Sequence, residues 1–64
     1  MSKKKDERQT QIRNILLQEG RIKIVDLAKL LKVTPETLRN DLNEMEQQNI
    51  VIREHGYARM DNSL

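Results

Sequence analysis

Two amphipathic segments meet at a two-residue joint, residues 32–33, and this joint is the feature that most constrains the fold. Before the joint, apolar residues at positions 24, 27, 28 and 31 follow the i, i+3, i+4, i+7 spacing of one helix face. After it, Thr34 suits the N-cap of a new helix and Pro35 suits its first position. Because so short a joint cannot let two helices lie end to end, they must cross at a steep angle. The sequence therefore predicts a helix-turn-helix over about residues 24–48.

The second helix of this pair, from Pro35 to about Gln48, has one apolar and one polar side. Leu38, Leu42 and Met45 share a face and are expected to pack in the core. The opposite face carries polar groups, and side chains of this kind can hydrogen-bond base edges in the major groove of DNA. The candidate base-reading residues are Glu36, Thr37, Arg39 and Asn40.

A plainer interpretation is that these four residues are only the solvated face of an amphipathic helix. Glu36 in particular suits the positive end of the helix dipole. Asp41 lies at the margin of the apolar face, and we expect it to form an ion pair with a basic residue of an earlier helix.

The remaining elements complete a mainly α (α+β) fold. A first helix is predicted from about Glu7 to Glu19, with Asp6 as its N-cap and Gly20 after its end. After a left-handed Asn49 the apolar period changes to two, which predicts a hairpin with Ile50 and Ile52 facing in and Val51 and Arg53 facing out. Its turn is Glu54-His55-Gly56, and Ile22 could add a third strand. Three helices followed by a small β-hairpin wing make a winged helix-turn-helix.

The composition excludes several functional classes. The chain has 64 residues, one His and no Cys, so it offers no thiolate ligand or disulfide and little for metal or nucleophilic chemistry. The longest apolar runs have three residues, which excludes a membrane span and a secretory signal. We expect a single cytoplasmic domain that is not an enzyme, has no catalytic residue or metal site, and needs no cofactor or membrane.

Positive charge is concentrated in the first half of the chain. Residues 1–32 carry nine basic and four acidic side chains, whereas residues 33–64 carry three basic and six acidic ones. A basic, flexible tail is expected at residues 1–5; it could contact phosphate or only aid solubility. The candidate contacts to the DNA backbone, including those of the wing, are Lys3, Lys4, Lys5, Lys23, Arg53, His55, Gly56, Tyr57 and Arg59. His55 could instead be a simple turn residue, and Tyr57 could pack beneath the wing.

The chain also resembles a known family. The motifs that carry the resemblance are Ile24-Val25-Asp26-Leu27-Ala28, Thr37-Leu38-Arg39, Asp41-Leu42 and His55-Gly56, preceded by Glu7-Arg8-Gln9. Together they resemble the N-terminal domain of DeoR-type bacterial repressors from about Lys3 to Met60. The resemblance implies a winged helix-turn-helix domain over residues 6–60 that binds double-stranded DNA and regulates transcription, as a repressor of sugar or related metabolism.

The resemblance further implies what a full-length member contains. Family members continue into a sensor domain that binds a phosphorylated sugar or similar effector and drives homo-oligomerisation. Residues 61–64 are therefore expected to begin a linker to a C-terminal domain that is absent here. Four positions depart from the family pattern: Lys32, Asn40, Asn49 and Tyr57. The family pattern has two consecutive arginines in this helix. Asn40 stands in place of the second, which removes one positive charge from the DNA-binding face.

Two other functional classes remain open at this point. A winged helix can serve as a protein–protein interaction module without reading DNA, and a formal net charge of +2 is weak for a nucleic-acid binder. RNA binding ranks below both, because a single aromatic residue provides no stacking platform for bases.

Overall fold

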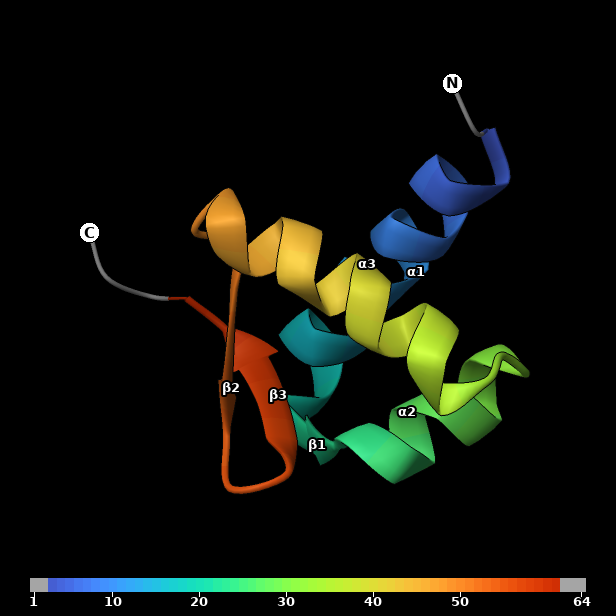
Figure 1. Ribbon diagram of the computed structural model, residues 1–64. Coiled ribbons are helices and arrows are strands. Elements are labelled where there is room, and N and C mark those ends of the chain that lie inside the picture. Colours follow the sequence, from blue (N-terminus) through green and yellow to red (C-terminus); the bar gives the residue numbers. More distant parts are fainter. Residues whose placement is uncertain (1–2, 62–64) are drawn as a thin grey trace.

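The computed structural model describes residues 3–61, which form three helices and one three-stranded antiparallel sheet (Figure 1). The elements in chain order are α1 (Lys3–Glu19), β1 (Arg21–Lys23), α2 (Ile24–Leu31), α3 (Pro35–Gln47), β2 (Val51–Glu54) and β3 (Tyr57–Met60). The winged helix-turn-helix predicted from the sequence is confirmed. No helix within residues 3–61 is long and apolar enough to cross a membrane.

The joint between α2 and α3 is built from local backbone preferences. Lys32 takes the left-handed conformation, with φ of 56°, and its N–H bonds back to the last turn of α2. Thr34 then caps α3: its hydroxyl oxygen accepts the backbone N–H of Thr37 at 3.2 Å. Pro35 occupies the first turn, where its missing N–H costs nothing. The short joint predicted at residues 32–33 is thus present, and Lys32 adopts a left-handed conformation that glycine adopts more often.

We expect the substitution Thr34→Ala to destabilise the domain by about 1 kcal/mol, because the N-terminal amides of α3 lose their side-chain acceptor. Urea unfolding followed by circular dichroism measures this loss. Thr34→Ser, which keeps the hydroxyl, is the matched control and should retain most of the stability. Equal losses in both variants would show that the methyl group, and not the cap, is what matters.

The sheet has the strand order β1-β3-β2. Ile22 pairs with Ala58, so the third strand expected at Ile22 is confirmed. The turn between β2 and β3 has positive φ at both central residues, 51° at His55 and 79° at Gly56, as a type I′ hairpin requires. The Gly56 carbonyl accepts the backbone N–H of Ile24 at 2.9 Å. This bond ties the wing turn to the start of α2, which has no side-chain cap of its own.

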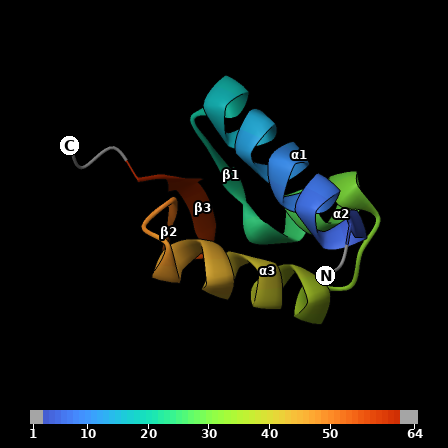
Figure 2. The ribbon, with the colours of Figure 1, turned by 90° about the horizontal axis from the view of Figure 1, so that it is seen from above.

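The core lies between α1 and α3, with the strands closing one end and α2 the other (Figure 2). Its buried residues come from every helix and from the two strands of the wing. They are Ile12, Leu16, Leu27, Ala28, Leu38, Leu42, Met45, Val51 and Ala58. The apolar faces predicted for α2 and α3 therefore do pack inward.

The predicted orientation of the first wing strand is wrong. Val51 is buried, whereas Ile50 and Ile52 are only partly buried. Asn49 is left-handed, with φ of 61° as expected, and it turns the chain so that β2 begins at Val51. Val51 then pairs with Met60 and Arg53 with Ala58, so Val51 and Arg53 share the helix-facing side of the sheet.

The first helix is longer than predicted. α1 begins at Lys3, so Lys3, Lys4 and Lys5 lie in a helix instead of a flexible tail, and Asp6 lies within the first turn instead of at the N-cap. Lys, Arg, Glu and Gln are favourable helix residues, and side chains of this segment also bond to α3. The end of α1 is as expected, with Gly20 at φ of 83°. Of the predicted tail and linker, residues 1–2 and 62–64 lie outside the described residues.

Candidate nucleic-acid interface

The outer face of α3 is open to solvent. Leu38, Leu42 and Met45 pack into the core on one side of the helix, which leaves the opposite side uncovered. Of the four predicted base-reading residues, Glu36, Arg39 and Asn40 are exposed and Thr37 is partly buried. The structure therefore brings these four together on the accessible part of the first two turns.

Thr37 has a second task in the helix cap. Its hydroxyl oxygen accepts a hydrogen bond from the Thr34 hydroxyl at 3.0 Å, while its own backbone N–H is donated to Thr34. The hydroxyl proton of Thr37 remains available for another acceptor. Thr37 can therefore support the cap and donate to a ligand at the same time.

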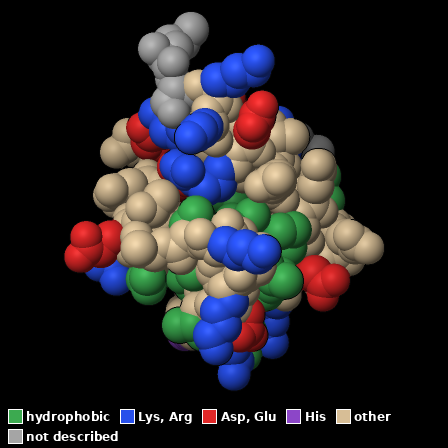
Figure 3. Space-filling view, turned by 90° about the vertical axis from the view of Figure 1, so that its right-hand side faces the viewer, with side chains coloured by type: hydrophobic (Ala, Val, Ile, Leu, Met, Phe, Trp, Pro, Cys, Tyr) green, Lys and Arg blue, Asp and Glu red, His purple; other side chains and the backbone are tan. Residues whose placement is uncertain are grey.

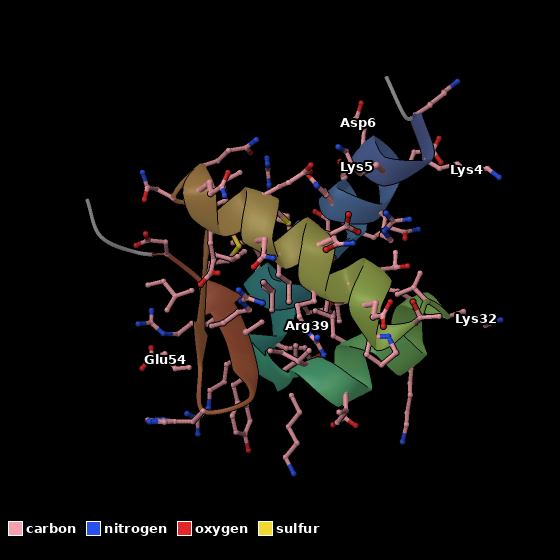
Figure 4. All side chains as sticks on the ribbon, viewed as in Figure 1. Lys4, Lys5, Asp6, Lys32, Arg39 and Glu54 are labelled. Atoms are coloured by element: carbon pink, nitrogen blue, oxygen red, sulfur yellow. The ribbon has the colours of Figure 1, made fainter. Side chains whose placement is uncertain are left out.

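The arginines around this face differ in their partners. Within residues 3–61, Arg39 and Arg13 have no ion-pair or hydrogen-bond partner, whereas the guanidinium groups of Arg53 and Arg59 are paired with carboxylates. Figure 4 shows Arg39 on the side of α3 that faces α2 and the sheet, with Lys5 on the opposite side of α3. Arg39 is thus an exposed cation at the edge of α3 that has no partner within residues 3–61.

An ion pair joins α1 to the middle of α3. Asp41 is only 2% exposed, and the guanidinium of Arg8 donates to both of its carboxylate oxygens, with Nη2 to Oδ1 at 3.0 Å. The hydrogen bond to Asp41 raises the pKa of Arg8. The expectation that Asp41 pairs with a basic residue of an earlier helix is confirmed. Because the pair lies behind the exposed face, it helps to set the angle of α3 in the domain.

A second polar bridge joins the same two helices nearer the surface. Lys5 Nζ and Gln9 Nε2 each donate to Glu44 at 2.9 Å. The hydrogen bonds from Lys5 and Gln9 lower the pKa of Glu44, and the hydrogen bond to Glu44 raises the pKa of Lys5. The stabilisation from Glu44 is therefore present at neutral pH and is lost as the pH falls through its lowered pKa. Lys5, a predicted phosphate contact, already has a carboxylate partner.

Two of the predicted wing residues, Tyr57 and Arg59, lie on the side of the sheet that faces away from the core. The guanidinium of Arg21 lies 4.7 Å from the ring centroid of Tyr57. Arg59 bonds to Glu54, with Nη2 to Oε1 at 2.7 Å, and Figure 4 shows Glu54 pointing away from the helices. His55 and Gly56 form the exposed turn. The ring of Tyr57 therefore stacks against Arg21 instead of packing beneath the wing.

Arg53 lies on the other side of the sheet from these residues. Its Nε and Nη2 atoms bond to Glu46 Oε1 at 3.0 and 2.7 Å, and Nη2 also donates to Asn43 Oδ1. Arg53 thus connects the wing to the second half of α3. Asn43 is not among the site residues predicted from the sequence, and no local signal marks its link to Arg53, ten residues later.

The two lysines at the start of α1, Lys3 and Lys4, are exposed, as is Lys23 at the end of β1. Figure 3, which views the side of the α2–α3 turn, shows Lys and Arg side chains gathered near the beginning of α1 and again at the height of the hairpin turn. Hydrophobic side chains lie between these two groups. Further Lys or Arg atoms lie among these hydrophobic side chains near the centre of the view, so the cations are spread over this face and not gathered in one patch. Within residues 3–61 no group of His, Cys, Asp or Glu could hold a metal ion.

A helix-turn-helix whose second helix exposes a polar face beside a β-hairpin wing defines the class of winged-helix DNA-binding domains. Within this class, the chain belongs to the family of the DeoR-like helix-turn-helix domain, whose family model matches residues 8–64. This is a family of DNA-binding domains of transcription regulators and not an enzyme family. The family resemblance predicted from the sequence is confirmed.

Curated relatives match almost the whole chain. The glycerol-3-phosphate regulon repressor of Escherichia coli is 35% identical over 60 residues, which are 94% of this chain and 24% of the repressor. The lactose phosphotransferase system repressor of Streptococcus mutans is 36% identical over 59 residues, 92% of this chain and 24% of that protein. The L-fucose operon activator of E. coli is 40% identical over 52 residues, which are 81% of this chain and 21% of the activator. The chain thus spans about a quarter of the length of these relatives. No solved structure matches it significantly.

Proposed function

We propose that this domain binds double-stranded DNA sequence-specifically, with α3 in the major groove and the β2–β3 wing on the phosphate backbone or in the minor groove. The observation that carries the proposal is the uncovered face of α3, on which Arg39 has no partner within residues 3–61 and Asn40 is exposed. A major groove about 12 Å wide admits one α-helix. Glu36, Thr37, Arg39 and Asn40 are the proposed base-reading residues.

Local neutralisation makes this face of α3 compatible with DNA. The helix carries four acidic residues, and three of them, Asp41, Glu44 and Glu46, are paired with Arg8, Lys5 and Arg53. Repulsion between α3 and the phosphates is therefore weaker than the helix sequence suggests. The proposed contacts to the backbone and wing are Lys3, Lys4, Lys5, Lys23, His55, Gly56, Tyr57 and Arg59, of which Lys5 and Arg59 would have to share or leave their carboxylates. Arg53, the other contact predicted from the sequence, bonds to Glu46 and Asn43 in the free domain.

A salt titration tests the proposal. We expect the isolated domain to bind duplex DNA with a micromolar Kd, because one small module lacks the second half-site of a dimer. The logarithm of its affinity should fall with the logarithm of salt concentration, with a slope of about −0.9 for each phosphate neutralised. Fluorescence anisotropy with a labelled duplex measures both quantities. A slope near zero, or the absence of binding, would contradict the proposal.

The wider role that we propose comes from the relatives of this chain. Several are named as repressors or activators of sugar-related operons. By analogy, we propose a cytoplasmic regulator, a repressor of sugar or related metabolism. It would form homo-oligomers through a further domain that binds a phosphorylated sugar or similar effector. Joining two copies of the domain through a dimeric fusion partner should then strengthen binding to a duplex with two half-sites.

A second candidate function is protein interaction, and one observation favours it. A groove between α1 and α2 is lined partly by Ile15, Leu30 and Leu31, and Leu30 is 60% exposed. A protein partner in this groove would bind with little dependence on salt, so the same titration separates this function from DNA binding.

A further inference from the structure

We propose that Asn43 is an additional base-contacting residue and that it acts only as a hydrogen-bond donor. Arg53 is the positioning residue: it binds the amide oxygen of Asn43 and leaves only the amide N–H groups for a base. The inference rests on the proposed DNA binding and adds to it a residue and a rule for the bases accepted. Asn43 would take a hydrogen-bond acceptor on a base edge, such as N7 of a purine, O6 of guanine or O4 of thymine.

The position of Asn43 continues the proposed base-reading surface. It lies three residues after Asn40 and four after Arg39 on α3, and residues at these spacings are neighbours on one helix face. Asn43 is exposed, as Arg39 and Asn40 are. Its side chain also lies next to the wing, because it contacts Arg53 of β2. Asn43 therefore stands where α3 and the wing meet, beside the proposed base-reading residues.

The chemistry of the contact determines which end of the amide points outward. A guanidinium group has only donors, so Arg53 can engage the amide of Asn43 only through its oxygen. Arg53 is itself held by two hydrogen bonds to Glu46. The Asn43 amide nitrogen has no partner within residues 3–61 and keeps both of its N–H donors. A free asparagine could read either a donor or an acceptor, whereas this one is restricted to acceptors.

This arrangement gives Arg53 a different role from the phosphate contact predicted from the sequence. Its guanidinium already has two partners on α3, and leaving them would expose the Glu46 carboxylate, unpaired, beside the DNA. If Arg53 stays in place, it touches no base and acts through Asn43. The two roles predict different effects on binding, and both can be measured.

The test is selection of bound duplexes from a randomised library, followed by sequencing, for the wild type and two variants. Asn43→Asp keeps the oxygen that Arg53 binds and replaces the donors by an acceptor, while Asn43→Ala removes the group without adding charge. In both variants the preference at one base pair should fall about tenfold, and with aspartate it should move toward a base that offers an amino group, such as cytosine. Asn14→Asp, an isosteric change on exposed α1, controls for the added negative charge.

Two further variants separate the roles of Arg53. Arg53→Lys keeps the positive charge but loses the planar fork, so preference should weaken at the same base pair that Asn43→Ala affects. Arg53→Met should do the same, with little change in the salt slope. If Arg53→Met instead weakened binding to all duplexes alike and reduced the slope by about one unit, Arg53 would be a phosphate contact and the positioning role would be wrong. Circular dichroism of each variant verifies that the domain is folded.

The outcomes distinguish this inference from the function on which it rests. If the wild type enriches no sequence, the proposed sequence-specific DNA binding fails. If the wild type enriches a motif that stays unchanged in Asn43→Asp and Asn43→Ala, only the role of Asn43 is overturned. Asn40→Ala serves as a positive control, because it should relax the preference at a different base pair.

Discussion

The substitution Arg8→Met is expected to destabilise the domain by about 3–5 kcal/mol, because it leaves the carboxylate of Asp41 buried without its partner. Asp41 is 2% exposed, so water cannot replace the lost hydrogen bonds without rearrangement. A domain of 64 residues without disulfides has a total stability of only a few kcal/mol. Most Arg8→Met molecules should therefore be unfolded, and DNA binding should be lost with the fold.

The size of this effect depends on which partner is removed. The Arg8 side chain is 22% exposed, so after Asp41→Asn its guanidinium can still reach water, and a smaller loss is expected. In Arg8→Met the charge that remains is the buried one. Methionine keeps an unbranched apolar stem of similar length to that of arginine, so the comparison isolates the charge.

Urea unfolding followed by circular dichroism measures the free energy of unfolding of each variant. Arg13→Met is the matched control: Arg13 lies on the same helix, is exposed and has no partner within residues 3–61, so its loss should stay within about 0.5 kcal/mol. The double variant Arg8→Met with Asp41→Leu should regain much of the stability, because it removes both charges. A loss below about 1 kcal/mol in Arg8→Met alone would mean that the pair contributes no more than a surface salt bridge.

The helix-turn-helix could be predicted from the sequence because its determinants are local. The apolar spacing of α2, the cap at Thr34 and the proline after it all act within a few residues. The same holds for the left-handed residues Gly20 and Asn49, where short polar or absent side chains permit positive φ. Local preferences and the global fold agree over this stretch, which is the condition under which sequence reasoning succeeds.

The orientation of β2 could not be predicted because its sequence does not alternate. Ile50, Val51 and Ile52 are three consecutive β-branched residues, and a shift of one residue exchanges the two faces of a strand. Only the pairing of Val51 with Met60 settles which residues face the helices. The early start of α1 has a similar cause, since Lys5 contacts Glu44 across 39 positions and no pattern within α1 reveals it.

The exposed face of α3 was accessible to sequence reasoning, but the partners of its charged residues were not. Periodicity alone places Glu36, Arg39 and Asn40 on the outer surface. The sequence alone, however, does not show which of Arg39 and Arg53 has an ion-pair partner. The structure separates them, since Arg53 is held by Glu46 whereas Arg39 has no partner within residues 3–61. Whether an arginine has an ion-pair partner depends on tertiary contacts. This pairing determines which arginine can contact DNA without first breaking an ion pair.

The substitution Arg39→Ala is expected to reduce affinity for the preferred duplex by about ten- to a hundredfold. An arginine that binds guanine through O6 and N7 is worth about 1–3 kcal/mol of discrimination, and one order of magnitude corresponds to 1.4 kcal/mol. Arg39 has no partner to leave within residues 3–61, so none of this energy is spent on breaking an ion pair of the free domain. Because the side chain is exposed on α3, folding stability should change little.

Fluorescence anisotropy with the duplex selected by the wild type measures the loss, and Arg13→Ala is the matched control. Both variants lose one exposed, unpaired arginine and one positive charge, but Arg13 lies on α1, which is behind α3 in the view of Figure 1. A loss concentrated at one base pair identifies Arg39 as a base reader, whereas a uniform loss with a slope reduced by about one unit identifies a phosphate contact. Either result places α3 against DNA. If Arg39→Ala and Arg13→Ala weakened binding equally, α3 would not be the element that enters the groove, and DNA would have to bind another surface.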